Sequence, residues 1–92
     1  MTALAAEAWR LSDSVSLRPE PFGALAYDFR TRRLSFLKTP TLVAVVQGLA
    51  ASATVGDALV AAGVPETERG AYLTALAGLA ETGILSPQEV SP

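Results

Sequence analysis

Few side chains in this sequence could carry out chemistry. The chain contains no cysteine and no histidine, which excludes disulfides, thiolate metal sites, cysteine nucleophiles and the commonest general base. Glu66 and Glu68 lie two residues apart, so they would not face each other on a helix, and acids in a first turn favour the helix dipole. No G-x-x-x-x-G-K phosphate loop occurs. The sequence therefore predicts that the protein is not an enzyme and that it has no catalytic residue, metal site or cofactor.

The charges are distributed unevenly along the chain. Six of the seven Lys and Arg residues lie within the first 38 positions, although the net charge is −2, and acidic residues dominate the remainder. A net negative charge argues against a general nucleic-acid binder, because duplex binding depends on cations that neutralise phosphates. The six basic residues are Arg10, Arg18, Arg30, Arg32, Arg33 and Lys38.

Three segments alternate between polar and apolar residues, as half-buried strands do. They cover residues 14–17, 23–29 and 33–37, and the last two are three residues apart, which predicts a β-hairpin. Along the third segment the side chains divide between two faces, with Leu34 and Phe36 on one and Arg33, Ser35 and Leu37 on the other.

Prolines and large apolar residues add detail to the first two strands. Pro19 cannot donate to a ladder and Pro21 follows closely, so this segment belongs at a strand end or a sheet edge. In the second strand the large residues share one face, namely Leu25, Tyr27 and Phe29.

The rest of the chain predicts three helices. Thr39 before Pro40 supplies an N-cap followed by proline at the first helical position. Thr54 and Asp57 resemble a capping box for a second helix, and Pro65 opens the third. Apolar residues at helical spacing follow the first cap (Leu42, Val45, Val46, Leu49) and the last proline (Tyr72, Leu73, Leu76, Leu79).

These elements predict one α+β domain, a three-stranded antiparallel sheet followed by three helices in a winged helix-turn-helix-like arrangement. We expect a flexible N-terminal arm over residues 1–8, the domain over 9–86 and a C-terminal tail over 87–92. No basic region precedes an apolar run at the N-terminus, and no stretch approaches the ~18 apolar residues of a membrane span. We therefore expect a cytoplasmic protein.

The third strand would leave an open sheet edge, whose free N–H and C=O groups can bind an extended peptide by β-augmentation. The last helix would form the opposite wall of a cleft. Basic residues near this edge could steer an acidic peptide or block aggregation, and the sequence favours neither interpretation. The predicted peptide-binding residues are Arg33, Leu34, Ser35, Phe36 and Leu37 on the strand and Arg69, Tyr72, Leu73, Leu76 and Ala80 on the helix.

A winged-helix DNA-binding transcriptional regulator is the alternative function that this topology suggests. The helix that would enter the major groove carries Glu66, Glu68 and Glu81 against Arg69, which would oppose acids to phosphates. The sequence therefore favours peptide binding over nucleic-acid binding, and it leaves open whether the free edge also pairs two copies into a homodimer.

Two stretches of the sequence resemble a known family. Residues 9–27, with their Arg-Pro-Glu-Pro-Phe-Gly segment at 18–23, and residues 32–38 closely resemble the mycofactocin system chaperone, and the similarity extends over roughly residues 9–85. That family belongs to the precursor-peptide recognition elements related to the pyrroloquinoline quinone biosynthesis chaperone.

The resemblance implies a three-stranded sheet and three helices that bind the leader of a ribosomally made precursor peptide as a fourth strand. It also implies association with a radical S-adenosylmethionine (SAM) maturase, which holds the iron–sulfur clusters and modifies the peptide. The segment at residues 18–23 is either a turn locked by two prolines or a surface that faces the maturase. On the second interpretation Arg18, Glu20 and Phe22 meet the enzyme. A further alternative is a scaffold that only joins the maturase through residues 19–27 and binds no peptide unless the enzyme is present.

Overall fold

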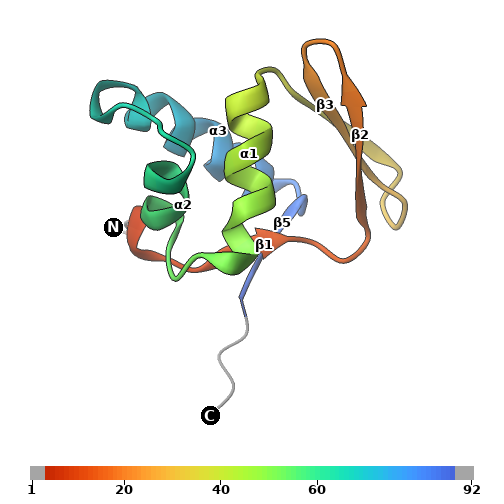
Figure 1. Ribbon diagram of the computed structural model, residues 1–92. Coiled ribbons are helices and arrows are strands. Elements are labelled where there is room, and N and C mark those ends of the chain that lie inside the picture. Colours follow the sequence, from red (N-terminus) through yellow and green to blue (C-terminus); the bar gives the residue numbers. More distant parts are fainter. Residues whose placement is uncertain (1–3, 89–92) are drawn as a thin grey trace.

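The computed structural model describes residues 4–88, and its main sheet is a three-stranded antiparallel meander (Figure 1). Strands β2 (Val15–Glu20), β3 (Gly23–Asp28) and β4 (Arg33–Leu37) are adjacent in that order, so β2 and β4 form its two edges. Three α-helices follow the sheet. This confirms the predicted α+β class with an N-terminal antiparallel sheet.

The first edge strand is longer than the sequence pattern indicated, because β2 continues through Pro19 to Glu20. Pro19 lies opposite Ala24 of β3. A proline is tolerated in a sheet where its missing N–H would face away from the neighbouring strand. The strand therefore passes through Pro19 and ends before the two-residue connection to β3.

The helices begin where the predicted caps lie. Helix α1 (Pro40–Gly48) follows Thr39, whose side chain accepts a hydrogen bond from the Leu42 N–H at 3.0 Å. Helix α2 (Val55–Ala61) follows Thr54, which accepts from the Asp57 N–H at 3.1 Å. Helix α3 (Arg69–Glu81) begins later than predicted. The residues directly after Pro65 instead form a 3-10 turn, η3 (Glu66–Glu68).

A second, two-stranded sheet joins the two ends of the domain and was not predicted. Strand β1 (Trp9–Leu11) pairs with β5 (Leu85–Pro87), which lies more than 70 residues later in the chain. The Gln88 side-chain amide donates to the carbonyl oxygens of Trp9 at 2.9 Å and Leu49 at 2.8 Å. These contacts fix both ends against α1 and the 3-10 turn after it, η2 (Leu49–Ala51).

Part of the segment expected to be a flexible arm is packed in the structure. Residues 4–6 form a 3-10 turn, η1 (Leu4–Ala6), which contacts α2 and α3. The Val55 N–H donates to the Glu7 carbonyl at 2.9 Å, and the Gln88 N–H donates to the Ala8 carbonyl at 3.0 Å. Residues 1–3 and 89–92 lie outside the described residues, so the domain boundaries stay a prediction.

The inner face of the sheet carries two alanines of β3 and one leucine of β4. Ala24, Ala26 and Leu37 are buried on the face that meets α1, whereas Tyr27, Leu34 and Phe36 project from the opposite face. Helix α1 lies between this sheet and α2 (Figure 1). Alanines let the helix approach the sheet closely, and the large residues are left on the outside. Within residues 4–88 no helix is both long and apolar enough to cross a membrane.

Candidate functional site

One hydrogen bond just beyond the end of β3 shows toward which neighbouring strand each residue of the sheet points its backbone N–H and C=O groups. The Phe29 N–H donates to the Ser14 carbonyl at 3.0 Å. This bond flanks the pair Val15–Asp28, so that pair is a non-hydrogen-bonded pair of the antiparallel ladder. Because the two pair types alternate along a ladder, the backbone groups of Asp28 point away from β2 and toward β4.

The same alternation fixes which groups of β4 are free. Arg33 and Ser35 lie opposite Asp28 and Ala26, and their backbone N–H and C=O groups point toward β3. The backbone groups of Leu34 and Phe36 therefore point out of the sheet. In the described part of the chain β4 has no further strand partner, so these four groups form an open edge.

A buried carboxylate shapes the turn that leads into β4. Asp28 is fully buried, and its Oδ1 accepts from the backbone N–H groups of Arg30 at 2.9 Å and Thr31 at 3.4 Å. The Asp28 carbonyl accepts from the Arg32 N–H at 2.6 Å, and Arg32 has a positive φ of 61°. A turn without Gly or Asn can thus adopt a left-handed position because the aspartate holds the preceding N–H groups.

The environment of Asp28 favours the ionised carboxyl. Burial alone would raise the pKa of Asp28, but the nearby hydroxyl of Ser14 and the hydrogen bonds from the Arg30 and Thr31 N–H groups lower the pKa further than burial raises it. Its Oδ2 atom accepts no hydrogen bond from residues 4–88. The role of Asp28 was not predicted, because an aspartate at a strand end has the sequence pattern of an ordinary exposed turn residue.

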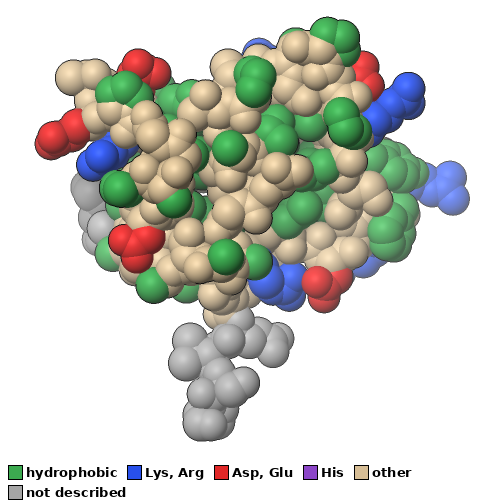
Figure 2. Space-filling model, in the orientation of Figure 1, with side chains coloured by type: hydrophobic (Ala, Val, Ile, Leu, Met, Phe, Trp, Pro, Cys, Tyr) green, Lys and Arg blue, Asp and Glu red, His purple; other side chains and the backbone are tan. Residues whose placement is uncertain are grey.

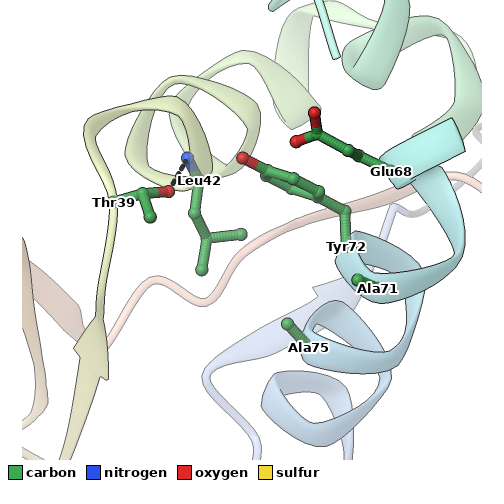
Figure 3. A pocket seen from close by; sticks show the side chains of 6 residues that line it. All are labelled: Thr39, Leu42, Glu68, Ala71, Tyr72 and Ala75. Carbon is green, nitrogen blue, oxygen red and sulfur yellow. Dashed lines mark hydrogen bonds between the residues drawn. The ribbon is translucent and has the colours of Figure 1, made fainter. Parts of the chain in front are cut away.

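A groove opens where β4 runs into α1, and α3 forms its far wall. The pocket there has a volume of about 290 Å³. In Figure 3 the side chain of Tyr72 reaches from α3 toward the start of α1, and Leu42 extends into the gap between them. The small side chains of α3 leave the space open. The lining residues are Thr39, Leu42, Glu68, Ala71, Tyr72 and Ala75.

The groove wall differs from the predicted one. Of the five α3 residues expected there, only Tyr72 lines the pocket. Leu76 is fully buried in the core and Leu73 packs against that core, so the face offered to the groove carries alanines. Arg69 Nε instead donates to the Val64 carbonyl at 3.3 Å, and Ala80 lines a separate hollow on another side of the helix.

The predicted strand residues also separate into two groups. Leu34 and Phe36 are each 59% exposed, and Arg33 is exposed as well. Ser35 is half-buried, and Leu37 is completely buried in the core. Leu37 therefore cannot offer its side chain to a partner. Alternation along the strand predicted that Leu37 lies on the opposite face from Phe36, but it did not predict which face the helices cover.

The segment at residues 18–23 combines a structural and an exposed part. A Cβ atom on Gly23 would collide with the Leu37 carbonyl oxygen, so this glycine permits β3 and β4 to approach. Arg18 and Glu20 form an ion pair at 3.1 Å. Phe22 is 40% exposed at the hairpin tip, with its ring centroid 6.0 Å from that of Phe36.

The chain matches known proteins over most of its length. The model of a family described as the peptide chaperone MftB family matches residues 8–86. A relative from Mycobacterium ulcerans, named peptide chaperone MftB, is 54% identical over 81 residues, which are 88% of this chain and 74% of the relative. Relatives with the same name come from Mycobacterium tuberculosis (48% identical, covering 90% and 76%) and Mycolicibacterium smegmatis (51% identical, covering 86% and 78%). No solved structure matches this chain.

Proposed function

This chain belongs to the peptide chaperone MftB family, and we propose that it captures the leader of a ribosomally made precursor peptide as a fourth strand on β4. The family name places the protein among non-catalytic peptide chaperones of mycofactocin biosynthesis. The observation that carries the binding mode is the open edge of β4, where the N–H and C=O groups of Leu34 and Phe36 point outward. An extended peptide can bind all four groups through its own backbone.

The groove beside β4 supplies side-chain selectivity in this proposal. Side chains of a strand project alternately to its two faces, so every second residue of the guest would point toward the pocket lined by Leu42, Tyr72 and Ala75. The lining is mainly apolar, which favours an aliphatic or aromatic guest residue. Ordering the peptide costs roughly 2–5 kcal/mol of the gross interaction energy, so the expected affinity is near micromolar, about −8 kcal/mol.

Basic side chains surround the proposed edge. Arg30, Arg32, Arg33 and Lys38 form no ion pair among the described residues, and all four are exposed. Their charge would speed the encounter with an acidic leader. The bound peptide is then delivered to a radical SAM maturase, and we place the surface that meets this enzyme at the exposed hairpin tip, with Arg18, Glu20 and Phe22.

The test compares two substitutions at one position of the free edge. Phe36→Pro and Phe36→Thr both remove the ring, but only proline removes the outward N–H. The sheet already tolerates a proline at the corresponding outward position of β2, Pro19. We expect the proline variant to bind the precursor peptide about tenfold more weakly than the threonine variant, since a guest carbonyl loses its donor.

Titration calorimetry with the precursor peptide measures both affinities, and thermal unfolding confirms that both variants are folded. Equal affinities for two folded variants would contradict strand addition at Phe36. Failure of the wild-type protein to bind the peptide at all would contradict the proposed function itself.

A further inference from the structure

The outer face of the three-stranded sheet carries an apolar patch that the core does not use. Five of the six large hydrophobic residues that are exposed in the described structure lie on this sheet or its turns. We define the outer sheet patch as the large side chains that project from this face. Four of its members are among these exposed residues, namely Phe22, Tyr27, Leu34 and Phe36, and the half-buried Leu25 is the fifth.

The patch is continuous across the strands. Leu25 lies opposite Phe36 and Tyr27 lies opposite Leu34, so their side chains are direct cross-strand neighbours. Phe22 at the hairpin tip extends the patch through its contact with Phe36. Exposed patches of this kind on small proteins commonly mark interaction sites.

Charges around the outer sheet patch indicate the chemistry of its partner. Arg30 and Arg32 in the β3–β4 turn and Lys38 after β4 are exposed, and none of them forms an ion pair within residues 4–88, whereas Arg33 projects from the opposite face of the sheet. Figure 2 shows hydrophobic side chains gathered at the sheet side of the molecule with Lys and Arg side chains at their margin. The complementary surface is an apolar area edged with carboxylates.

Strand addition at β4 would enlarge this patch. A fourth strand lies ~4.8 Å from its neighbour, and alternate guest residues project to the same face as Leu34 and Phe36. The other residues point toward the groove. A guest peptide would thus place one set of side chains in the groove and add the other set to the outer sheet patch.

From this geometry we infer that the outer sheet patch and the guest strand together form one composite surface, which docks the peptide-modifying enzyme. This inference rests on the proposed function, because the guest strand supplies part of the surface. The enzyme would carry an apolar area edged with acidic residues. It would therefore bind the loaded chaperone more tightly than the free chaperone, by about fivefold or more. By thermodynamic linkage, the enzyme would increase the affinity for the peptide by the same factor.

The test uses side chains of the outer sheet patch that do not belong to β4, so the backbone groups of the open edge stay unchanged. The variant Phe22→Ser/Tyr27→Thr removes two exposed rings from the hairpin tip and from the central strand. Val60→Ser is the matched control, because Val60 is 59% exposed on α2. Surface plasmon resonance measures binding of the radical SAM maturase to each protein, with and without saturating precursor peptide. Calorimetry measures peptide binding separately.

We expect the double variant to retain peptide affinity within about twofold and to bind the enzyme about tenfold or more weakly, as loss of interface aromatic residues does. The Val60 control should bind both partners like the wild type. Two results would overturn the inference while the proposed function stands. In the first, the double variant binds the enzyme as tightly as the wild type does. In the second, the loaded and the free wild-type protein bind the enzyme equally. If the double variant does not bind the enzyme and the wild type does not bind the peptide, the result would instead contradict the proposed function.

A second copy of this chain is the other occupant that the test must resolve. If the patch joins two copies, sedimentation analysis would show a dimer for the wild type and a monomer for the double variant. That result would overturn docking of the enzyme on this face. A wild type that is monomeric at the concentrations used for binding supports the inference.

Discussion

The two outer edges of the sheet have the same strand geometry but offer different numbers of free N–H donors. On β2 the outward residues are Val15, Leu17 and Pro19. The Val15 N–H already donates to the Ser12 carbonyl at 3.0 Å, and proline has no N–H. Leu17 is therefore the one residue of β2 whose N–H can reach a guest chain.

On β4 both outward residues, Leu34 and Phe36, have N–H and C=O groups that no described residue binds. A groove lies beside the end of β4, and the pocket there includes Leu42 and Tyr72. Natural sheets protect edges with proline and with locally satisfied backbone groups. In the proposed function, this difference leaves the β2 edge protected against pairing and the β4 edge available for it.

The groove distinguishes the two edges most strongly, and changing it should have the largest effect on the affinity for the precursor peptide. Replacing Tyr72 with Ala should weaken precursor-peptide binding by about tenfold, because an aromatic side chain that anchors a partner commonly contributes more than 1 kcal/mol. Tyr72→Phe keeps the ring and should bind within about twofold of the wild type. Calorimetric titration of the three proteins measures this. Similar affinities for the alanine variant and the wild type would remove the groove from the account.

The charge around β4 should produce a smaller effect. Raising the salt concentration from low to about 0.5 M should weaken binding of an acidic leader by about two- to fivefold, since exposed charges are screened. Arg30→Gln should reduce this salt dependence without changing stability. Fluorescence anisotropy with a labelled precursor peptide measures both. A salt-independent affinity would contradict electrostatic steering.

Asp28 links the pH to the stability of the β3–β4 hairpin. Its folded-state pKa lies below the ordinary value of 3.8, so the stability that its carboxylate contributes is present above that value and is lost as the pH falls through the folded-state pKa. Asp28→Asn should therefore be less stable than the wild type at pH 7, and the difference should shrink below about pH 4.

Denaturant unfolding at several pH values measures the Asp28 effect. Asp13→Asn is the matched control, because the Asp13 side chain is 93% exposed and its ion pair with Arg10 lies at the surface. A stability difference for Asp28→Asn that stays constant between pH 7 and pH 3 would show that the carboxylate does not hold the turn through its charge.

Adding a backbone N–H donor to β2 should have the smallest effect on the affinity for the precursor peptide. Pro19→Thr adds one outward N–H to the protected edge, but the β2 edge has no counterpart of the β4 groove among the described pockets. The peptide affinity should change by less than about twofold. A clear gain in affinity would mean that backbone donors alone determine which edge binds.

Local signals allowed much of this fold to be predicted from the sequence. The caps at Thr39 and Thr54 act within three residues, and the structure confirms both. The β1–β5 pair escaped prediction because each strand has three residues and the two lie at opposite ends of the domain. Short strands show little alternation, and their pairing depends on the packing of the whole chain.

The candidate site was predicted less completely than the fold. Alternation separated Leu37 from Phe36 correctly, but it could not tell which face α1 would cover. The alanines of β3 decide this, since they let the helix approach the sheet. Leu76 was expected in the groove because it is large and apolar, yet the core buries it, and Ala71 and Ala75 line the groove instead.

Amide hydrogen exchange with and without the precursor peptide tests the open edge of β4 most directly. The Ser35 N–H points toward β3, so it should exchange slowly in both states. The Leu34 and Phe36 N–H groups should exchange quickly in the free protein and become protected when the peptide binds, whereas Leu17 on β2 should not change. Protection of Leu17 alone, or Leu34 and Phe36 amides that are already protected in the free monomer, would contradict capture of the peptide at β4.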